Sequence, residues 1–455
     1  VVLVQGASVD DTLELLVHDI FSVADSVSAK DGGTFSGTIA AAGYSSSTAG
    51  TSNYIAGVNA GNSITAGGNF NVTVGDEAGT ALTTGDGNVA VGFEALATED
   101  ADGSNTAIGY RALKVLNAGA EGYNVAVGTD AGLSMTLGIQ NTLVGNKAGD
   151  ALTDADFNVA VGRSSLTSDT LGSKSTAVGH GTLNTQNFTS ATDSFNTAVG
   201  YQAGAAVTTG ASNTFVGALA GDANTTGYEN TAVGEGSLSA CTEGFENTAI
   251  GHNSGAAITT GDNNTFVGNA AGQANTTANG NTAVGNAALA SNTTGTNNVA
   301  VGRGALDANT TADNNTAVGY NALAANTEGF SNTAFGSRAG DAITTGDYNT
   351  ALGNLALSAD TTGAGSVAIG HAALATQNST DSADMYNTAV GREAGTGITT
   401  GVRNSSVGHR TLASTTTGYY NTAIGYQAGD DITDGFRNIC IGHDADISAG
   451  NNQHT

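Results

Sequence analysis

Five of the seven histidines directly follow a glycine that closes a short apolar run: His180, His252, His371, His409 and His443. If copies of the chain were related by a three-fold axis, three copies of one such histidine could surround a metal ion. In other copies of the same pattern this position holds Tyr, Arg or Asn, as at Tyr110, Arg163 and Asn286. We therefore interpret it as a tolerant surface or interface position, and we expect neither a metal ion nor a cofactor.

Acidic residues are the other candidates for chemistry, with 40 Asp and Glu against 12 Lys and Arg and a formal net charge of −28. The turns lack both the Gly-Gly-x-Gly-x-Asp calcium repeat and an EF-hand loop. We therefore expect the acidic side chains to keep the surface of a thin rod hydrated. A negative chain cannot neutralise phosphates, which argues against nucleic acid as a partner. No Gly-x-Ser-x-Gly, His-Glu-x-x-His or phosphate-binding loop is present, so we predict that the protein is not an enzyme.

The two cysteines, Cys241 and Cys440, are separated by about twelve copies of the repeat described next. That separation predicts that they form no disulfide with each other. The sequence also lacks any stretch of ~18 apolar residues, so we expect no insertion into a membrane.

A repeat positions all these side chains. Its most frequent form is Asn-Thr-Ala-Val-Gly, and its closing glycine recurs 22 times, usually every 17 residues, with one step of 19 and two of 21. The closing glycines are at positions 75, 92, 109, 128, 145, 162, 179, 200, 217, 234, 251, 268, 285, 302, 319, 336, 353, 370, 391, 408, 425 and 442. A degenerate copy precedes them at residues 53–57.

Each copy reads as one coil of a β-solenoid. A β-branched residue, a small residue and another apolar residue precede the closing glycine, which is the alternation of a short strand. A second glycine ten residues later, as at Gly85 or Gly346, suits a turn with positive φ. The lead asparagines should stack into an amide ladder, and Ser175 and Ser366 are the two exceptions to it. The sequence thus predicts an all-β, elongated parallel β-solenoid or β-roll of about 22–23 coils.

Two positions of the coil compensate for one another. Where Leu stands four residues after the closing glycine, as at Leu96, the residue three places later is usually polar; where Gly stands there, as at Gly79, the later residue is apolar, as at Leu82. We therefore expect one large apolar group per coil to fill the interior. Two copies break the rule and carry Phe215 or Phe266 in the strand, whose rings we expect to supply the missing volume.

The N-terminal part follows another pattern. Apolar residues recur every three or four positions, which predicts a coiled coil whose β-branched members favour three or four strands over two. The stripe consists of Val9, Leu13, Leu16, Ile20, Val23 and Val27. An amphipathic helix packed on a globular domain is the alternative. We predict an N-terminal strand and trimeric neck at 1–29, a connector at 30–52 and the repeat at 53–455. Because Asn451 and Asn452 would open another coil, we expect the chain to be part of a longer protein.

The three longer copies contain insertions at residues 117–121, 187–194 and 378–384. The latter two interrupt the same turn and should project from the same side. Such loops can carry recognition, although solenoids also tolerate insertions at little cost. Candidate contact residues in them are Asn187, Phe188, Asp193, Asn378, Asp381 and Asp384.

The repeat resembles the head repeats of YadA-type trimeric autotransporter adhesins, which form trimeric β-rolls, and similar repeats occur in tail fibres of tailed bacteriophages. The stretch from Gly32 to Gly37 also resembles an element of phage tail fibres. The coil is longer than the usual YadA-type unit. The resemblance implies a homotrimer located in the virion as a tail-fibre shaft. Its partners would be other tail or fibre proteins at the N-terminal end and a host cell-surface glycan or protein receptor.

Two other functions stay open. The first is a trimeric adhesin head on a bacterial cell surface, which would bind host or matrix surfaces. The second is a monomeric ice-binding solenoid, suggested by the threonines at 197, 231 and 282. Against ice binding, this position alternates between Thr and Val, so we expect it to face the interior.

Overall fold

The computed structural model describes residues 49–119, 121–379, 381 and 384–447. The predicted neck residues, Val9 to Val27, lie outside this range, as do the predicted connector up to residue 48 and the start of the further coil at Asn451. The chain divides into two compact units at residues 160 and 161. Each is built from short parallel strands joined by turns, and no helix occurs among the described residues.

The predicted solenoid is confirmed, with about 23 turns and a 17-residue repeat. The first unit contains β1 (Tyr54–Ala56), β2 (Val72–Val74), β3 (Val89–Val91), β4 (Thr106–Ile108), β5 (Val125–Val127) and β6 (Thr142–Val144), and β7 (Val159–Val161) lies at the boundary. The second unit contains β8 (Gly172–Ser173), β9 (Thr176–Val178), β10 (Thr192–Asp193), β11 (Thr197–Val199), β12 (Thr214–Val216), β13 (Thr231–Val233), β14 (Thr248–Ile250), β15 (Thr265–Val267), β16 (Thr282–Val284), β17 (Val299–Val301), β18 (Thr316–Val318), β19 (Thr333–Phe335), β20 (Thr350–Leu352), β21 (Val367–Ile369), β22 (Thr388–Val390), β23 (Ser405–Val407), β24 (Thr422–Ile424) and β25 (Ile439–Ile441).

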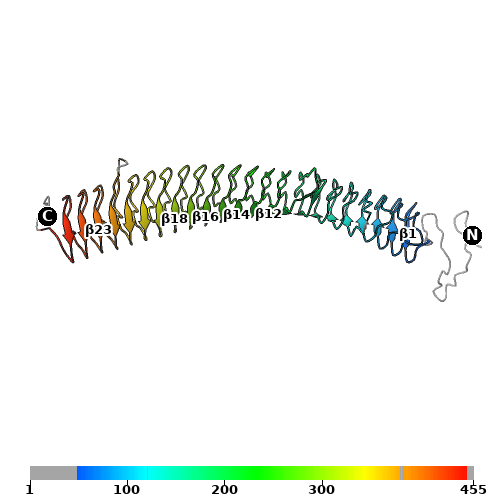
Figure 1. Cartoon of the computed structure of the whole chain (residues 1–455), viewed down its shortest axis with the longest axis horizontal. Helices are drawn as coiled ribbons and strands as arrows, with labels where there is room; N and C mark the ends of the chain where they lie inside the picture. Colours follow the sequence, from blue (N-terminus) through cyan, green and yellow to red (C-terminus); the bar gives the residue numbers. More distant parts are fainter. Residues whose placement is uncertain (1–48, 120, 380, 382–383, 448–455) are drawn as a thin grey trace, which may run out of the picture. The chain divides into compact units, whose positions relative to one another are not determined.

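Equivalent strands of successive coils pair in parallel without any shift of register. Within the second unit, for example, Ala283 of β16 lies opposite Ala300 of β17, and Figure 1 shows the strands side by side. The longer coils keep the same register, because Thr176 pairs with Thr197 across an insertion of four residues. Insertions therefore change the turns and leave the strands in place.

The closing glycine is required by close approach between coils. At Gly285, φ is +139°, and a Cβ atom there would lie 2.6 Å from the carbonyl oxygen of Gly302. The second glycine has a different role from the one expected. At Gly346, φ is not in the left-handed region, and a Cβ atom would lie 2.3 Å from the carbonyl oxygen of Gly363. Contact with the next coil, and not positive φ, therefore selects glycine at this second position.

The strand faces the opposite way from our expectation. Its central alanine is buried, as at Ala283 and Ala300, whereas the flanking Thr282 and Val284 reach the surface. Successive strand residues point to opposite faces, so a buried Ala places both neighbours outside. The prediction that the Thr position faces the interior was wrong. The large side chains that fill the interior come from the opposite wall, so the strand can place only a small residue there.

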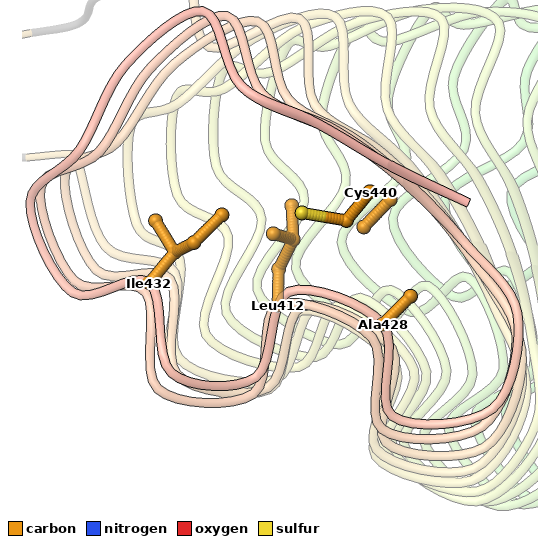
Figure 2. Packing of buried hydrophobic residues seen from close by; sticks show 5 residues of the cluster. Leu412, Ala428, Ile432 and Cys440 are labelled. Carbon is orange, nitrogen blue, oxygen red and sulfur yellow. The ribbon is translucent and has the colours of Figure 1, made fainter. Parts of the chain in front are cut away.

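That opposite wall confirms the predicted compensation. Figure 2 shows Leu412 and Ile432, which come from the two alternative positions of successive coils, extending toward Cys440 on the strand side. A Cβ atom at Gly429 would lie 2.8 Å from Cδ2 of Leu412, so the glycine makes room for its neighbour's side chain. Phe215 fills the exceptional coil as predicted, because a Cβ atom at Gly221 would lie 2.5 Å from its ring.

Candidate interaction surface

The outward strand face is the most extensive candidate surface. We call the residue before each closing glycine the outer apolar row. It is Val, Ile, Leu or Phe in every coil from β2 to β25. Its members are half-buried or exposed, reaching 40% exposure at Ile250 and 55% at Phe335. Within each unit, such an apolar row on a surface is typical of a protein contact.

Beneath this face, the lead asparagines form the predicted ladder. The Oδ1 atom of Asn281 accepts a hydrogen bond from the backbone N–H of Asn298 at 2.9 Å, and its Nδ2 donates to the carbonyl of Gly295 at 2.9 Å. Both side chains are buried. Each asparagine thereby satisfies polar backbone groups of its own coil and of the next, which explains why the residue recurs.

The Ser175 exception has a structural reason in the 21-residue coil that it opens. Gln186 reaches the ladder from the opposite wall, where its Nε2 donates to Ser175 Oγ at 2.9 Å and to Asp169 Oδ2 at 2.6 Å. Asn196 Nδ2 donates to Gln186 Oε1 at 2.9 Å. The short serine leaves the space that the glutamine amide occupies.

Asp169 also holds the backbone of its own coil and of the insertion in the next one. Its Oδ1 accepts hydrogen bonds from the N–H groups of Gly172, at 3.0 Å, and Phe188, at 3.1 Å. The strand β8, at the end of the preceding coil, pairs with β10 of the long coil. The insertion is thus anchored by a buried carboxylate in the preceding coil.

The second 21-residue coil repeats the arrangement. Gln377 Nε2 donates to Ser366 Oγ at 2.9 Å and also to Asp360, and Asn387 Nδ2 donates to Gln377 Oε1 at 2.8 Å. Asp360 Oδ1 accepts from the N–H of Ser379 at 3.1 Å. Two insertions separated along the sequence therefore use the same set of residue types.

Glu99 occupies the equivalent position before the 19-residue coil. It is fully buried, its Oε1 accepts from the N–H of Asp102 at 3.2 Å, and its Oε2 has no hydrogen-bond partner. Burial, with the charge of Asp102 as a smaller contribution, raises the pKa of Glu99 to about 8. This carboxyl is therefore protonated in the folded chain at neutral pH.

The predicted contact residues in the loops are mostly engaged within the chain. Phe188 is buried, which corrects its assignment as a projecting contact, because the insertion needs an apolar residue over the coil below. Asp193 forms an ion pair with Lys174 at 2.6 Å. Asn187 accepts from Thr170 Oγ1 at 3.0 Å.

In the second loop, Asn378 accepts from Thr361 Oγ1 at 3.1 Å and Asp381 accepts from Ser379 Oγ at 3.1 Å. Asp384 accepts from the hydroxyl of Tyr386 at 3.0 Å. Asp381 and Asp384 are exposed. The six residues belong to two separate coils and form no common site.

Four of the five histidines after the closing glycine are exposed, and His409 is half-buried. Three of them, His180, His409 and His443, stack with tyrosine rings of adjacent coils. The ring of Tyr426 lies between those of His409 and His443, with centroids 5.3 and 5.0 Å away. Among the described residues, the group with metal-ligating atoms close together is instead Asp430, Asp431 and Asp446. All three lie at the surface of the terminal coils, and their carboxylates alone do not define a site.

Both cysteines are free, as their separation predicted, and both are buried. Burial raises the pKa of Cys241 to about 11, which keeps it a thiol at neutral pH. In the described ranges, no helical segment has the length and hydropathy that a bilayer crossing requires.

A second outward row precedes the strand. We call the residue immediately before each lead Asn or Ser the turn row. From Lys174 to Arg437, every member has φ between 48° and 73°. Glycine and asparagine adopt this conformation most readily, and four successive coils have them: Asn263, Gly280, Asn297 and Asn314. Four later coils have Tyr386, Arg403, Tyr420 and Arg437 instead.

No known protein-family model matches the chain, and no curated protein matches its sequence. The assignment of a function therefore rests on the surfaces themselves.

The glutamine–aspartate networks and the turn row were not predicted from the sequence. The networks had a signal in the sequence, because the three acids at one coil position, Glu99, Asp169 and Asp360, each precede a longer coil.

Proposed function

We propose that the chain is a structural shaft of a bacteriophage tail fibre, assembled as a homotrimer that supports attachment to a host receptor. The observation that carries the proposal is the outer apolar row. It runs from coil to coil at a constant position, and its side chains are only partly covered by their own chain.

Burial of this row by other copies has a clear physical advantage. The interior of each coil is narrow, with an Ala-lined wall and one or two large apolar side chains. Each Å² of apolar surface removed from water stabilises by ~25 cal/mol, and the row offers such surface in every coil. Three copies packed through these faces would add a central core that a single chain lacks.

A parallel alignment of identical copies also fits the row. The spacing between coils is constant, so residues of one copy can meet the same residues of another at every level. The predicted neck stripe, Val9 to Val27, would set the number of chains at one end. The resemblance to tail-fibre and adhesin repeats adds the same expectation.

The test is the native mass of the full chain by light scattering after size exclusion. We expect about three chains. The triple variant Val284→Asp, Val301→Asp and Val318→Asp should dissociate, because charges in a dry interface are strongly unfavourable. Ser291→Asp, Thr294→Asp and Thr311→Asp add the same number of charges at exposed turn positions of the first two of these coils and should keep the wild-type mass. Ile20→Asp should weaken assembly through the neck.

A monomeric wild-type chain would overturn the trimeric shaft. The Thr residues of the strands would then face solvent, which supports the ice-binding alternative. A trimer would leave the choice between fibre and adhesin head to the adjacent genes. Baseplate genes would support the fibre in a virion, and a membrane-anchor barrel downstream would support the adhesin on a bacterial surface.

A further inference from the structure

We propose that Tyr386, Arg403, Tyr420 and Arg437 form a binding site for an acidic polysaccharide that carries a carboxylate on alternate sugar rings. The inference deepens the proposed function, since it names a receptor class for the fibre. The four residues occupy the turn row of four successive coils, so aromatic and cationic side chains alternate along the stacking direction.

The central arginine is held ready for an anion. The guanidinium carbon of Arg403 lies 5.8 Å from the ring centre of Tyr386 and 5.5 Å from that of Tyr420. Its Nη1 donates to the Tyr420 hydroxyl at 3.3 Å. Rings on both sides limit the freedom of the side chain, while its remaining N–H groups can still bind a carboxylate.

Neither Arg403 nor Arg437 forms an ion pair with any residue that the structure describes. By contrast, Arg392 and Arg410 both lie beside Glu393, at 2.9 and 3.8 Å. The chain has 40 acidic residues for 12 Lys and Arg, so partners of opposite charge are plentiful. Arg403 and Arg437, which lie two coils apart in the turn row, are therefore available to the carboxylates of an external ligand.

The backbone at these positions is strained, as it is along the whole turn row. At Tyr386, Arg403, Tyr420 and Arg437, φ is 48°, 59°, 56° and 59°. A residue with a Cβ atom costs about 1 kcal/mol in this region, and bulky residues are uncommon there. The tyrosines are 49% and 45% exposed, so they contribute little to the core in exchange. Because the whole turn row shares this conformation, the strain does not by itself distinguish the four residues; the alternation of rings and guanidinium groups does.

The spacing selects the ligand. Parallel strands lie ~4.8 Å apart, so residues two coils apart are separated by roughly 9.5 Å, about the length of an extended disaccharide. One arginine could then bind each acidic sugar, and one tyrosine could pack against each neutral sugar. A nucleic-acid strand carries a charge every ~3.4 Å, and an extended peptide places side chains on one face every ~6.8 Å, so neither matches.

The probe is hyaluronate oligosaccharide, in which a uronic acid alternates with a neutral sugar, and binding to the full chain is measured by titration calorimetry. Dextran and a single-stranded oligonucleotide are the comparison ligands. We expect hyaluronate alone to bind. The double variant Arg403→Gln and Arg437→Gln should weaken binding about 100-fold, roughly tenfold for each charge-assisted contact.

Arg303→Gln is the matched control, because Arg303 is exposed, lies 5.9 Å from the ring of Tyr320 and has no alternating neighbours. It should change affinity less than about twofold, as a surface substitution away from the site. Tyr420→Asn should lower the affinity and raise the melting temperature, because Asn relieves the strained turn. A merely structural tyrosine would lower both.

Several results would overturn the site. They are equal binding of dextran or of the oligonucleotide, no binding of hyaluronate, and an equal loss in Arg303→Gln. A changed native mass in the double arginine variant would also overturn it, because the row would then contact a second copy. Native mass separates the two proposals: a trimer that ignores hyaluronate refutes only the site, and a monomer that binds it refutes only the trimeric shaft.

Discussion

The coils that precede residues 105–123 and 175–195 bury an acid at the same position, with different results. Asp169 is surrounded by donors, from the Gln186 amide and from the N–H groups of Gly172 and Phe188. Glu99 has one backbone donor and an oxygen without a partner. The four-residue insertion is accompanied by a glutamine, whereas the shorter insertion leaves Leu116 at that position.

The comparison shows what a solenoid needs in order to change the length of one coil. The strands cannot shift, because their register is fixed by both neighbours. The additional backbone must therefore find hydrogen-bond partners in the turn. A buried carboxylate is a suitable acceptor for it only when the next coil supplies enough donors.

Removing the glutamine should have the largest effect. Gln186→Leu leaves the Asp169 carboxylate without its amide donor, and Asn196 Nδ2 keeps only one of its two acceptors, the carbonyl of Gly210. We expect the free energy of unfolding to fall by about 3 kcal/mol, measured by urea denaturation of the full chain. Gln273→Leu, at an exposed position, should change it by less than about 0.5 kcal/mol. Equal effects would mean that the network is dispensable.

Replacing Glu99 should raise the free energy of unfolding instead of lowering it. Glu99→Leu matches Leu82 and Leu116 in the adjacent coils and removes a buried carboxyl in which one oxygen lacks a partner. We expect a gain of about 2 kcal/mol at pH 7.5. No gain at this pH would show that the Glu99 carboxyl is satisfied in solution.

The pH dependence gives the same test a second readout. The pKa of Glu99 rises from 4.5 to about 8 on folding. Its contribution to stability is therefore fully present below pH 4.5 and is lost as the pH rises toward 8, by up to about 1.4 kcal/mol per pH unit. The gain from Glu99→Leu should shrink at pH 4. A gain independent of pH would contradict the raised pKa.

Restoring the consensus should have the smallest effect. Ser366→Asn places an amide where the side chain of Gln377 now donates to the serine hydroxyl. We expect a loss of about 1 kcal/mol from crowding, although Asn is favoured at this position in other coils. The double variant Ser366→Asn and Gln377→Leu should lose less than the sum of its single changes. Strict additivity would show that the two residues do not interact.

Much of the architecture was predictable from the sequence, because a single pattern repeats. The 17-residue period, the asparagine ladder, the exchange between positions such as Leu412 and Ile432, and the free cysteines all follow from local rules that each coil restates. Alternation alone did not predict which face of the strand is buried. Thr282 and Val284 could both have packed in the interior, but only the small side chain of Ala283 fits there.

The candidate surfaces were predictable only in part. The insertions were visible, but the burial of Phe188 depends on the coil beneath it. The turn row was missed because its conformation is invisible in the residue types, which range from Gly280 to Tyr420. The pairing of Gln186 with Asp169 joins residues 17 positions apart, one coil to the next, so it requires knowledge of which side chains face inward.

The fixed register also has a mechanical consequence. Within the second unit, each coil is held to the next by a strand of three residues, by one member of the asparagine ladder and by hydrogen bonds between the turns. A force along the stacking direction is carried through these junctions in series, so the weakest junction sets the force at which coils separate. Ser175 and Ser366 interrupt the ladder, but their glutamines reconnect it from the opposite wall. The longer coils can thus transmit tension like their neighbours.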